Sequence, residues 1–201
     1  VIGVSGGIDS AVNAALYRSI LPAENILLVN TPTRYNSELT KGLAAELAEN
    51  LGCQFLTVPI GDFIDETADA LEGLPLPDDT VHLTGFMKEN MQARDRSSRI
   101  LAALSAAFGG IFTCNANKTE TTVGYGTLYG DLAGAFAATA DLWKYQIYDL
   151  GRKLNAWYGR AVIPEGIFTV MPSAELSENQ DVTQGKGDPL IYEYHDYLFR
   201  S

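Results

Sequence analysis

The amino-acid sequence predicts an α/β fold: an open, doubly wound parallel sheet with helices on both of its faces. Short apolar runs typical of buried strands alternate along the chain with segments whose apolar residues recur at helical spacing. This alternation indicates βαβ units, in which right-handed crossovers join parallel strands. The predicted strands are Val1–Val4, Ile26–Asn30, Phe55–Ile60 and Ile111–Cys114.

Five helices are predicted between and after these strands. In Glu38–Leu51 a leucine recurs at every fourth position, and the segment stops at Gly52, a typical C-terminal signal. The helix Lys88–Phe108 is likewise followed by Gly109 and Gly110. The full set of predicted helices is Asp9–Ile20, Glu38–Leu51, Asp62–Leu71, Lys88–Phe108 and Asp141–Tyr158.

Two segments are predicted to be loops. Gly73–Thr84 is rich in Pro and Asp, and Met171–Pro189 carries Pro and Gly among many polar residues. The second is long for a connection without secondary structure, which is typical of functional lids or disordered stretches. In the tail that follows, we expect His195 and the tyrosines to belong to a packed amphipathic helix rather than to a site.

Composition limits the class of protein. The 201 residues indicate one domain with a real core, and the formal charge of −11 disfavours a nucleic-acid or anionic-membrane partner. Cys114 falls in a predicted buried strand and Cys53 lies just before another, so reduced core thiols are expected. No zinc-like Cys/His spacing, signal peptide or membrane-spanning apolar run occurs, which predicts a cytoplasmic protein. Because the chain begins without Met inside a strand, we expect a domain over 1–201 that is truncated at both ends.

The run Ser5–Ser10, S-G-G-I-D-S, follows the first predicted strand directly. Two glycines let the backbone approach a ligand, and the first N–H groups of the next helix then point at an anion such as phosphate. The run is not a Walker A loop, and it resembles the pyrophosphate loop of ATP pyrophosphatases. The alternative is an ordinary glycine turn capped by Asp or Ser, which the density of glycine and polar residues disfavours.

Polar clusters also follow two other predicted strands, at 30–37 and 115–120. In open α/β sheets, ligands bind beyond the carboxyl ends of the strands. Loops are polar in any protein, so one cluster alone is weak support. Three clusters on one edge, one of them a phosphate loop, predict the binding site there.

Six motifs in order make the resemblance to a family specific. Together they are similar to the NAD⁺ synthetase family, and more particularly to the synthetase domain of its glutamine-dependent members, over residues 1 to about 176. Leu128 stands where the ammonia-dependent type often has Lys, which favours the glutamine-dependent branch. The motifs are SGGIDS, TPTRYNS, ENMQAR, NKTE, GYGTLYGD and PSAEL.

The resemblance implies a reaction and its participants. Family members use Mg²⁺ and ATP to adenylate the nicotinate carboxylate of deamido-NAD⁺, and ammonia then displaces AMP to give NAD⁺. The implied fold is adenine nucleotide alpha-hydrolase-like. A glutaminase domain outside this segment would supply ammonia from glutamine, and the enzyme would be a homodimer or higher oligomer.

The resemblance also assigns residues to the phosphates and the metal. Asp9 and Glu120 match Mg²⁺ ligands, and carboxylates with phosphate oxygens are what Mg²⁺ prefers. From the residues alone, Asp9 could instead be a helix cap, Glu120 a surface charge and Lys144 a solvated lysine. The residues expected at the phosphates are Ser5, Gly6, Gly7, Asp9, Ser10, Lys144 and Ser173.

Further positions match the nucleotide and substrate sides. Arg94 matches the arginine that contacts deamido-NAD⁺, and Asp131 borders the nicotinate end and is a candidate base for ammonia. Asn115 stands near the adenine, where many members have Thr. Lys118 could meet a substrate phosphate or stay solvated. Arg34 and Gln92 are candidates on the ATP side, and the expected catalytic residues are Asp9, Lys144 and Asp131.

Two other readings remain open from the sequence. One is a sibling amidoligase such as GMP synthetase, which shares only the loop. The other is a nucleotide-binding module without turnover, which the joint presence of Asp9, Glu120 and Lys144 disfavours. The products distinguish them, since only a synthetase releases AMP and pyrophosphate.

Overall fold

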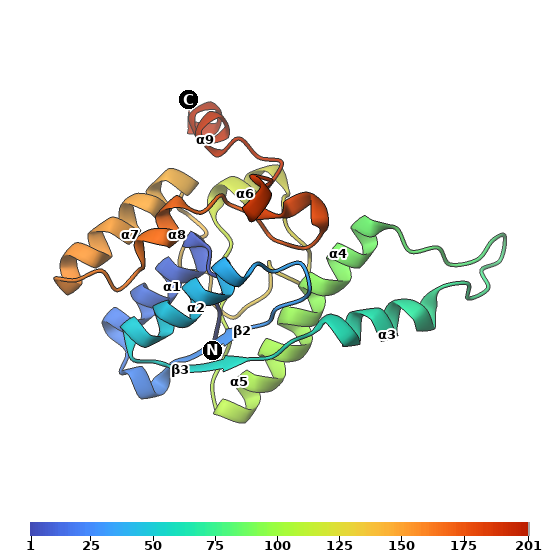
Figure 1. Cartoon of the computed structure of the whole chain (residues 1–201), viewed down its shortest axis with the longest axis horizontal. Coiled ribbons are helices and arrows are strands. Elements are labelled where there is room, and N and C mark those ends of the chain that lie inside the picture. The colour runs from blue at the N-terminus through green and yellow to red at the C-terminus, as the bar shows by residue number, and fades with distance from the viewer. Residues whose placement is uncertain (201) are drawn as a thin grey trace.

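A computed structural model describes residues 1–200 of the chain, and a parallel sheet lies at its centre (Figure 1). The strands β1 (Ile2–Gly3), β2 (Leu27–Asn30) and β3 (Gln54–Thr57) pair in the order β1-β2-β3. Ile2 lies opposite Leu28, and Leu28 lies opposite Phe55. The α/β class and the parallel pairing are as predicted, although each strand is shorter than expected.

The predicted fourth strand, Ile111–Cys114, is wrong as a strand. The segment still runs beside β1: the amino group of Val1 donates to Ile111 O (2.7 Å) and Thr113 N donates to Val1 O (3.1 Å). Only an isolated parallel bridge between Thr113 and Phe136 follows. Because β1 is so short, it offers too few backbone groups for a ladder here. β1 therefore lies between this segment and β2, which makes its carboxyl end the switch point where doubly wound sheets bind ligands.

Alternate residues of the strands face two separate cores, so helices cover both faces of the sheet. Ile2 and Leu28 join the larger core, with α1 (Ile8–Ile20), α2 (Glu38–Leu51) and α7 (Lys144–Tyr158). Leu27 and Val29 join the smaller core on the opposite face, where Leu101, Leu104 and Phe108 pack.

One long helical stretch was predicted as Lys88–Phe108, and it begins three residues earlier. It consists of α4 (Gly85–Arg94), a π-helical segment (Asp95–Leu101) and α5 (Ala102–Phe108). The Thr84 hydroxyl caps it by accepting from Met87 N (3.3 Å). Figure 1 shows α3 (Gly61–Leu71) and α4 projecting from the sheet as an arm joined by the predicted loop.

Several short elements were not predicted. The loop over 171–189 contains two 3₁₀ turns, and the tail forms a helix as expected, although its buried residue is Asp196 while Tyr194 and Tyr197 are exposed. Both cysteines are free thiols. Within residues 1–200, no helix is long and apolar enough to cross a membrane. The unpredicted helices are α6 (Lys118–Val123), α8 (Glu165–Thr169) and a 3₁₀ turn (Ala23–Asn25), and the tail helix is α9 (Tyr192–Arg200).

Close packing of α7 against α1 and α8 predicts the effect of a single substitution. A Cβ at Gly151 would lie 3.0 Å from Phe168 Cε1 and 3.1 Å from Val12 Cγ2. We expect Gly151→Val to lower the free energy of unfolding by about 1–3 kcal/mol through overpacking. Urea denaturation measures this, with Gly42→Val on the open face of α2 as the matched control. Equal stability of the two variants would contradict the packing described.

Candidate active site

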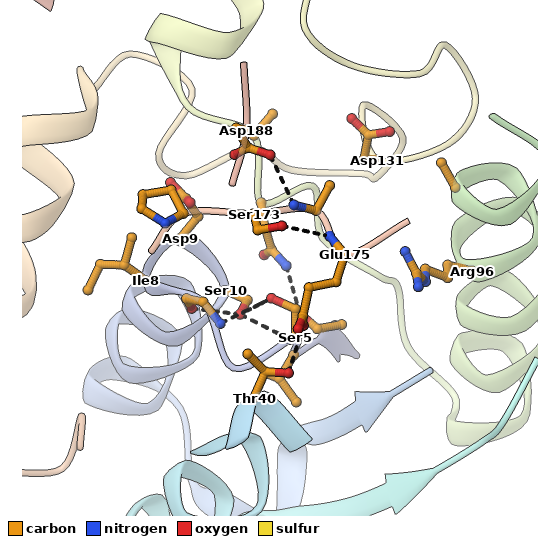
Figure 2. Close-up of a pocket in the computed structure, with 18 of the residues that line it drawn as sticks. Ser5, Ile8, Asp9, Ser10, Thr40, Arg96, Asp131, Ser173, Glu175 and Asp188 are labelled. Atoms are coloured by element: carbon orange, nitrogen blue, oxygen red, sulfur yellow. Dashed lines mark hydrogen bonds between the residues drawn. The ribbon is translucent and has the colours of Figure 1, made fainter. Parts of the chain in front are cut away.

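A pocket of about 260 Å³ lies at the carboxyl ends of β1 and β2 (Figure 2). The loop after β1, the start of α2, the π-helical segment and the loop over 171–189 all contribute to its walls. A pocket is therefore present at the sheet edge that was predicted to bind the ligand. The predicted site residues that line this pocket are Ser5, Gly7, Asp9, Ser10, Asn115, Glu120, Asp131, Lys144 and Ser173.

The glycine loop owes its shape to Gly6. This residue has a φ of +89°, and a Cβ on it would lie only 2.1 Å from Thr40 O in α2. Ser10 Oγ donates to Gly7 O (3.0 Å) and accepts from Ser5 N (3.2 Å), which closes the loop on the first turn of α1. The loop is thus a tight turn pressed against a second helix, with the N-terminal amides of α1 beside the pocket.

A buried ammonium joins two carboxylates next to this loop. Lys144 Nζ donates to Asp9 Oδ2 (2.6 Å) and Glu120 Oε1 (3.2 Å), and the lysine side chain is only 4% exposed. Asp9 Oδ1 also accepts from Asn117 Nδ2 (2.8 Å). Asp9 is therefore not a helix cap, Glu120 is not a surface charge and Lys144 is not a solvated lysine. We call Asp9, Glu120 and Lys144 the charged triad.

The environment of the triad sets its ionisation. Burial and the negative charge of Asp9 raise the pKa of Glu120 to about 7, against the opposing effect of Lys144. Burial alone would lower the pKa of Lys144, but Asp9 and Glu120 outweigh it and raise that pKa. The lysine is consequently a fixed positive charge, held where an anion on the glycine loop would meet it.

Asp188 and Tyr192, in the C-terminal part, cover the triad. The sequence analysis missed Asp188, and its expectation that the tyrosines of the tail lie away from a site is wrong for Tyr192. The Tyr192 hydroxyl contacts Asp188 Oδ2 (2.7 Å) and Glu120 Oε1 (3.1 Å), and its ring centroid lies 4.4 Å from Lys144 Nζ. Asp188 Oδ1 accepts from Tyr125 OH (2.8 Å). Burial, with the charges of Glu120 and Asp188, raises the pKa of Tyr192. These contacts shield the charged groups from water on one side.

A second buried carboxylate, Glu175, faces the other side of the pocket. Its oxygens accept from Thr40 Oγ1 (2.7 Å) and from Ser37 N (3.1 Å) at the start of α2, as Figure 2 shows for Thr40. The residue is 3% exposed and has a φ of +46°, a left-handed backbone that is uncommon outside glycine. Opposite it, Arg96 donates to Thr31 O (3.2 Å), and burial lowers its pKa to about 10.

The NAD synthase family model matches residues 1–200. The chain belongs to the NAD synthase family. It is 39% identical to a glutamine-dependent NAD(+) synthetase of Thermotoga maritima over all of this chain, and 38% identical to one of Xanthomonas campestris pv. campestris over 97% of it. The chain covers 33% and 35% of those two proteins, so it spans about a third of the length of these relatives.

Solved structures similar to this chain have the same fold, an adenine nucleotide alpha-hydrolase-like α/β sheet. NMN synthetase from Francisella tularensis superposes with a TM-score of 0.79 and 28% identity, over 99% of this chain and 75% of that one. A glutamine-dependent NAD+ synthetase from Acinetobacter baumannii, in complex with ADP, superposes with a TM-score of 0.73 and 30% identity. This match covers 98% of this chain and 39% of that one. The fold class predicted from the sequence is thereby confirmed.

Five of the predicted residues lie outside the pocket lining. One is Gly6, which shapes the glycine loop, and the other four lie farther from that loop in sequence. Arg34 forms an exposed ion pair with Asp65 (2.6 Å). Gln92 is buried and donates to Leu176 O (2.9 Å), while Arg94 is exposed and donates to Leu128 O (3.2 Å). Lys118 places its Nζ 4.7 Å from the centroid of the Trp143 ring. Their ligand roles stay predictions.

Three other predicted residues line the pocket, and the side chain of each is hydrogen-bonded to backbone atoms of the protein. Asn115 Nδ2 donates to Gly3 O (2.8 Å), beside β1. Ser173 Oγ donates to Gln180 O (2.7 Å), and the Asp131 carboxylate accepts from Thr127 N (2.9 Å). Across residues 1–200, no group of three or more His, Cys, Asp or Glu side chains forms a metal-binding cluster. Any metal at the triad would take its remaining ligands from a bound molecule or water.

The contact between Gly6 and α2 predicts that Gly6→Ala damages the loop. A side chain there meets both the positive φ and Thr40 O, so we expect a loss of about 1–3 kcal/mol in unfolding free energy. Guanidinium denaturation measures it. Gly7→Ala is the control, because Gly7 has a φ of −93° and its added Cβ would lie 3.3 Å from Ser5 Oγ. A Gly6→Ala variant as stable as Gly7→Ala would refute this account of the loop.

Proposed function

We propose that this chain is the synthetase domain of a cytoplasmic, glutamine-dependent NAD⁺ synthetase. It would adenylate the nicotinate carboxylate of deamido-NAD⁺ with ATP and then amidate it with ammonia, releasing pyrophosphate and AMP. The observation that carries this proposal is the charged triad beside the glycine loop in a member of the NAD synthase family. A buried lysine at a phosphate loop suits a reaction in which pyrophosphate leaves.

The glycine loop supplies the first part of the chemistry. The amides at the start of α1 and the hydroxyls of Ser5 and Ser10 face the pocket and suit the β- and γ-phosphates. As a carboxylate oxygen attacks the α-phosphorus, the bond to the β-phosphate oxygen breaks and negative charge grows on pyrophosphate. Lys144, fixed by Asp9 and Glu120, stabilises that charge without reorganising.

The donor set of the triad fits Mg²⁺. Mg²⁺ in nucleotide sites is held by one or two carboxylates together with substrate phosphates, and Asp9 and Glu120 are two carboxylates brought together by Lys144. These two residues would hold the ion. When bound, Mg²⁺ neutralises phosphate charge and polarises the phosphoryl oxygens.

The second step needs neutral ammonia and a site free of water. Ammonia attacks the acyl carbon of the adenylate, the bond from that carbon to the AMP oxygen breaks, and a proton leaves the nitrogen. Asp131, which lines the pocket, is the candidate to accept this proton. The loop over 171–189 covers the pocket through Ser173, and so limits hydrolysis of the adenylate.

The partners follow from the length of the relatives. Glutamine-dependent relatives are about three times as long as this chain, since it covers 33% of one of them. A glutaminase domain outside the segment would supply the ammonia. We further propose a homodimer or higher oligomer, with no nucleic-acid or membrane partner.

A second candidate concerns the substrate. The similarity to an NMN synthetase, with a TM-score of 0.79, favours amidation of a mononucleotide by the same chemistry. Adenylation and ammonia attack involve only the nicotinate end, so the pocket chemistry described serves both substrates. The competing GMP synthetase and pure binding readings predict other products or none.

The decisive assay follows NAD⁺ and AMP in the full-length protein that carries this chain. It receives ATP, Mg²⁺, either ammonium or glutamine, and either deamido-NAD⁺ or nicotinate mononucleotide. Equal amounts of NAD⁺ and AMP from deamido-NAD⁺ are expected. Product from the mononucleotide alone would favour the second candidate. ATP binding without any product would favour a binding module.

Removing either carboxylate of the triad tests the charge argument. We expect Asp9→Asn and Glu120→Gln to lower kcat by about 10²–10³-fold, because each carboxylate holds the Lys144 ammonium that stabilises the transition-state charge. Circular dichroism checks that each variant folds. Glu165→Gln, an exposed carboxylate on α8, is the matched control. Turnover at the unmodified level in both triad variants would remove Asp9 and Glu120 from the mechanism.

A further inference from the structure

A buried carboxylate in α9 lies behind the active site rather than in it. Asp196 is 3% exposed and does not line the pocket. One of its oxygens accepts from the Thr119 hydroxyl and the other from Tyr145 N (2.8 Å). Burying a carboxylate is costly unless its oxygens are hydrogen-bonded. The Tyr145 amide that donates to Asp196 belongs to the N-terminal end of α7, where the helix dipole is positive.

The partners of Asp196 are the sequence neighbours of two triad residues. Thr119 precedes Glu120 on α6, and Tyr145 follows Lys144 on α7. The fully buried Thr119 Oγ1 also accepts from Lys144 N (3.0 Å). One carboxylate therefore ties together the backbones on which Glu120 and Lys144 stand.

We propose that Asp196 is a positioning residue for the charged triad. By joining α6 to α7, it fixes the distance at which the Glu120 carboxylate and the Lys144 ammonium meet, 3.2 Å in this structure. If α6 and α7 moved apart, the Glu120 carboxylate on α6 and the Lys144 ammonium on α7 would separate. What the triad then does with ATP and Mg²⁺ rests on the proposed function.

Ring stacking by Phe199 also packs α9 against α7, independently of the hydrogen bonds of Asp196. The two contributions can therefore be removed one at a time. Phe199 stacks on Trp143 with ring centroids 6.2 Å apart, and it also stacks on His195 (5.9 Å). Phe199→Ala therefore weakens the docking of α9 while leaving the hydrogen bonds of Asp196 in place. Asp196→Ala removes those hydrogen bonds and leaves the ring stacking of Phe199 in place. A purely structural role would give the two variants the same pattern of effects.

The experiment measures ATP affinity by calorimetry with Mg²⁺ and with EDTA, beside kcat, in the full-length protein. For Asp196→Ala we expect the gain in ATP affinity caused by Mg²⁺, and kcat, each to fall about 10–100-fold, the range typical of residues behind metal ligands. Asp196→Asn should recover most of both, because its amide oxygen can accept from Tyr145 N and its NH₂ can donate to Thr119 Oγ1. Phe199→Ala should lower the melting temperature and leave the Mg²⁺-dependent gain in ATP affinity unchanged.

A second pair covers the case in which Asp196→Ala does not fold. Thr119→Val removes the hydroxyl that links Asp196 to Lys144 N, and Thr119→Ser keeps it. We expect only the valine variant to lose the Mg²⁺-dependent gain. Unchanged affinity and kcat in Asp196→Ala or Thr119→Val, or equal losses in Phe199→Ala, would overturn the positioning role. Unmodified protein that gains ATP affinity with Mg²⁺ but makes no amidated nucleotide would overturn the proposed function alone.

Discussion

The arrangement of the whole site depends on one ammonium group that is almost entirely buried. Lys144 is 4% exposed, and its charge is tolerated because Asp9 and Glu120 both face it. A buried ion pair contributes little net stability, since desolvation offsets its attraction. Its consequence is geometric: three segments far apart in sequence must meet at one point. α1, α6 and α7 are therefore positioned by charge as well as by apolar packing.

A second constraint acts on the opposite wall. Gly6 lies so close to Thr40 O that no side chain fits between the glycine loop and α2, and Glu175 fastens the loop over 171–189 to the same helix. The left-handed backbone at Glu175 costs free energy that its hydrogen bonds to Thr40 and Ser37 offset. The pocket is consequently framed by contacts within the protein, which lowers the ordering cost of binding a ligand.

Local patterns were enough to predict the core strands, the main helices and the glycine loop, because periodicity and turn residues act over short distances. The family resemblance added the roles of Asp9 and Glu120, which lie in its motifs, and of Lys144, which lies outside them. The fourth strand failed because an apolar run cannot reveal that its neighbour β1 is two residues long. Glu175 and Asp196 were missed for a related reason: each depends on partners distant in sequence, and nothing local distinguishes a buried carboxylate from a solvated one.

The parts of the site lie far apart in sequence, so they are synthesised at different times. The glycine loop lies at residues 5–10, whereas the groups that complete its surroundings lie near residues 120, 144 and 196. A chain leaves the ribosome from its N-terminus, so these contacts can form only after the C-terminal part has been made. A half-synthesised chain would thus display the glycine turn with neither Glu120 nor Lys144 beside it. The last described helix to emerge, α9, would convert that turn into a site, and its local unfolding would silence the site while the core stayed folded.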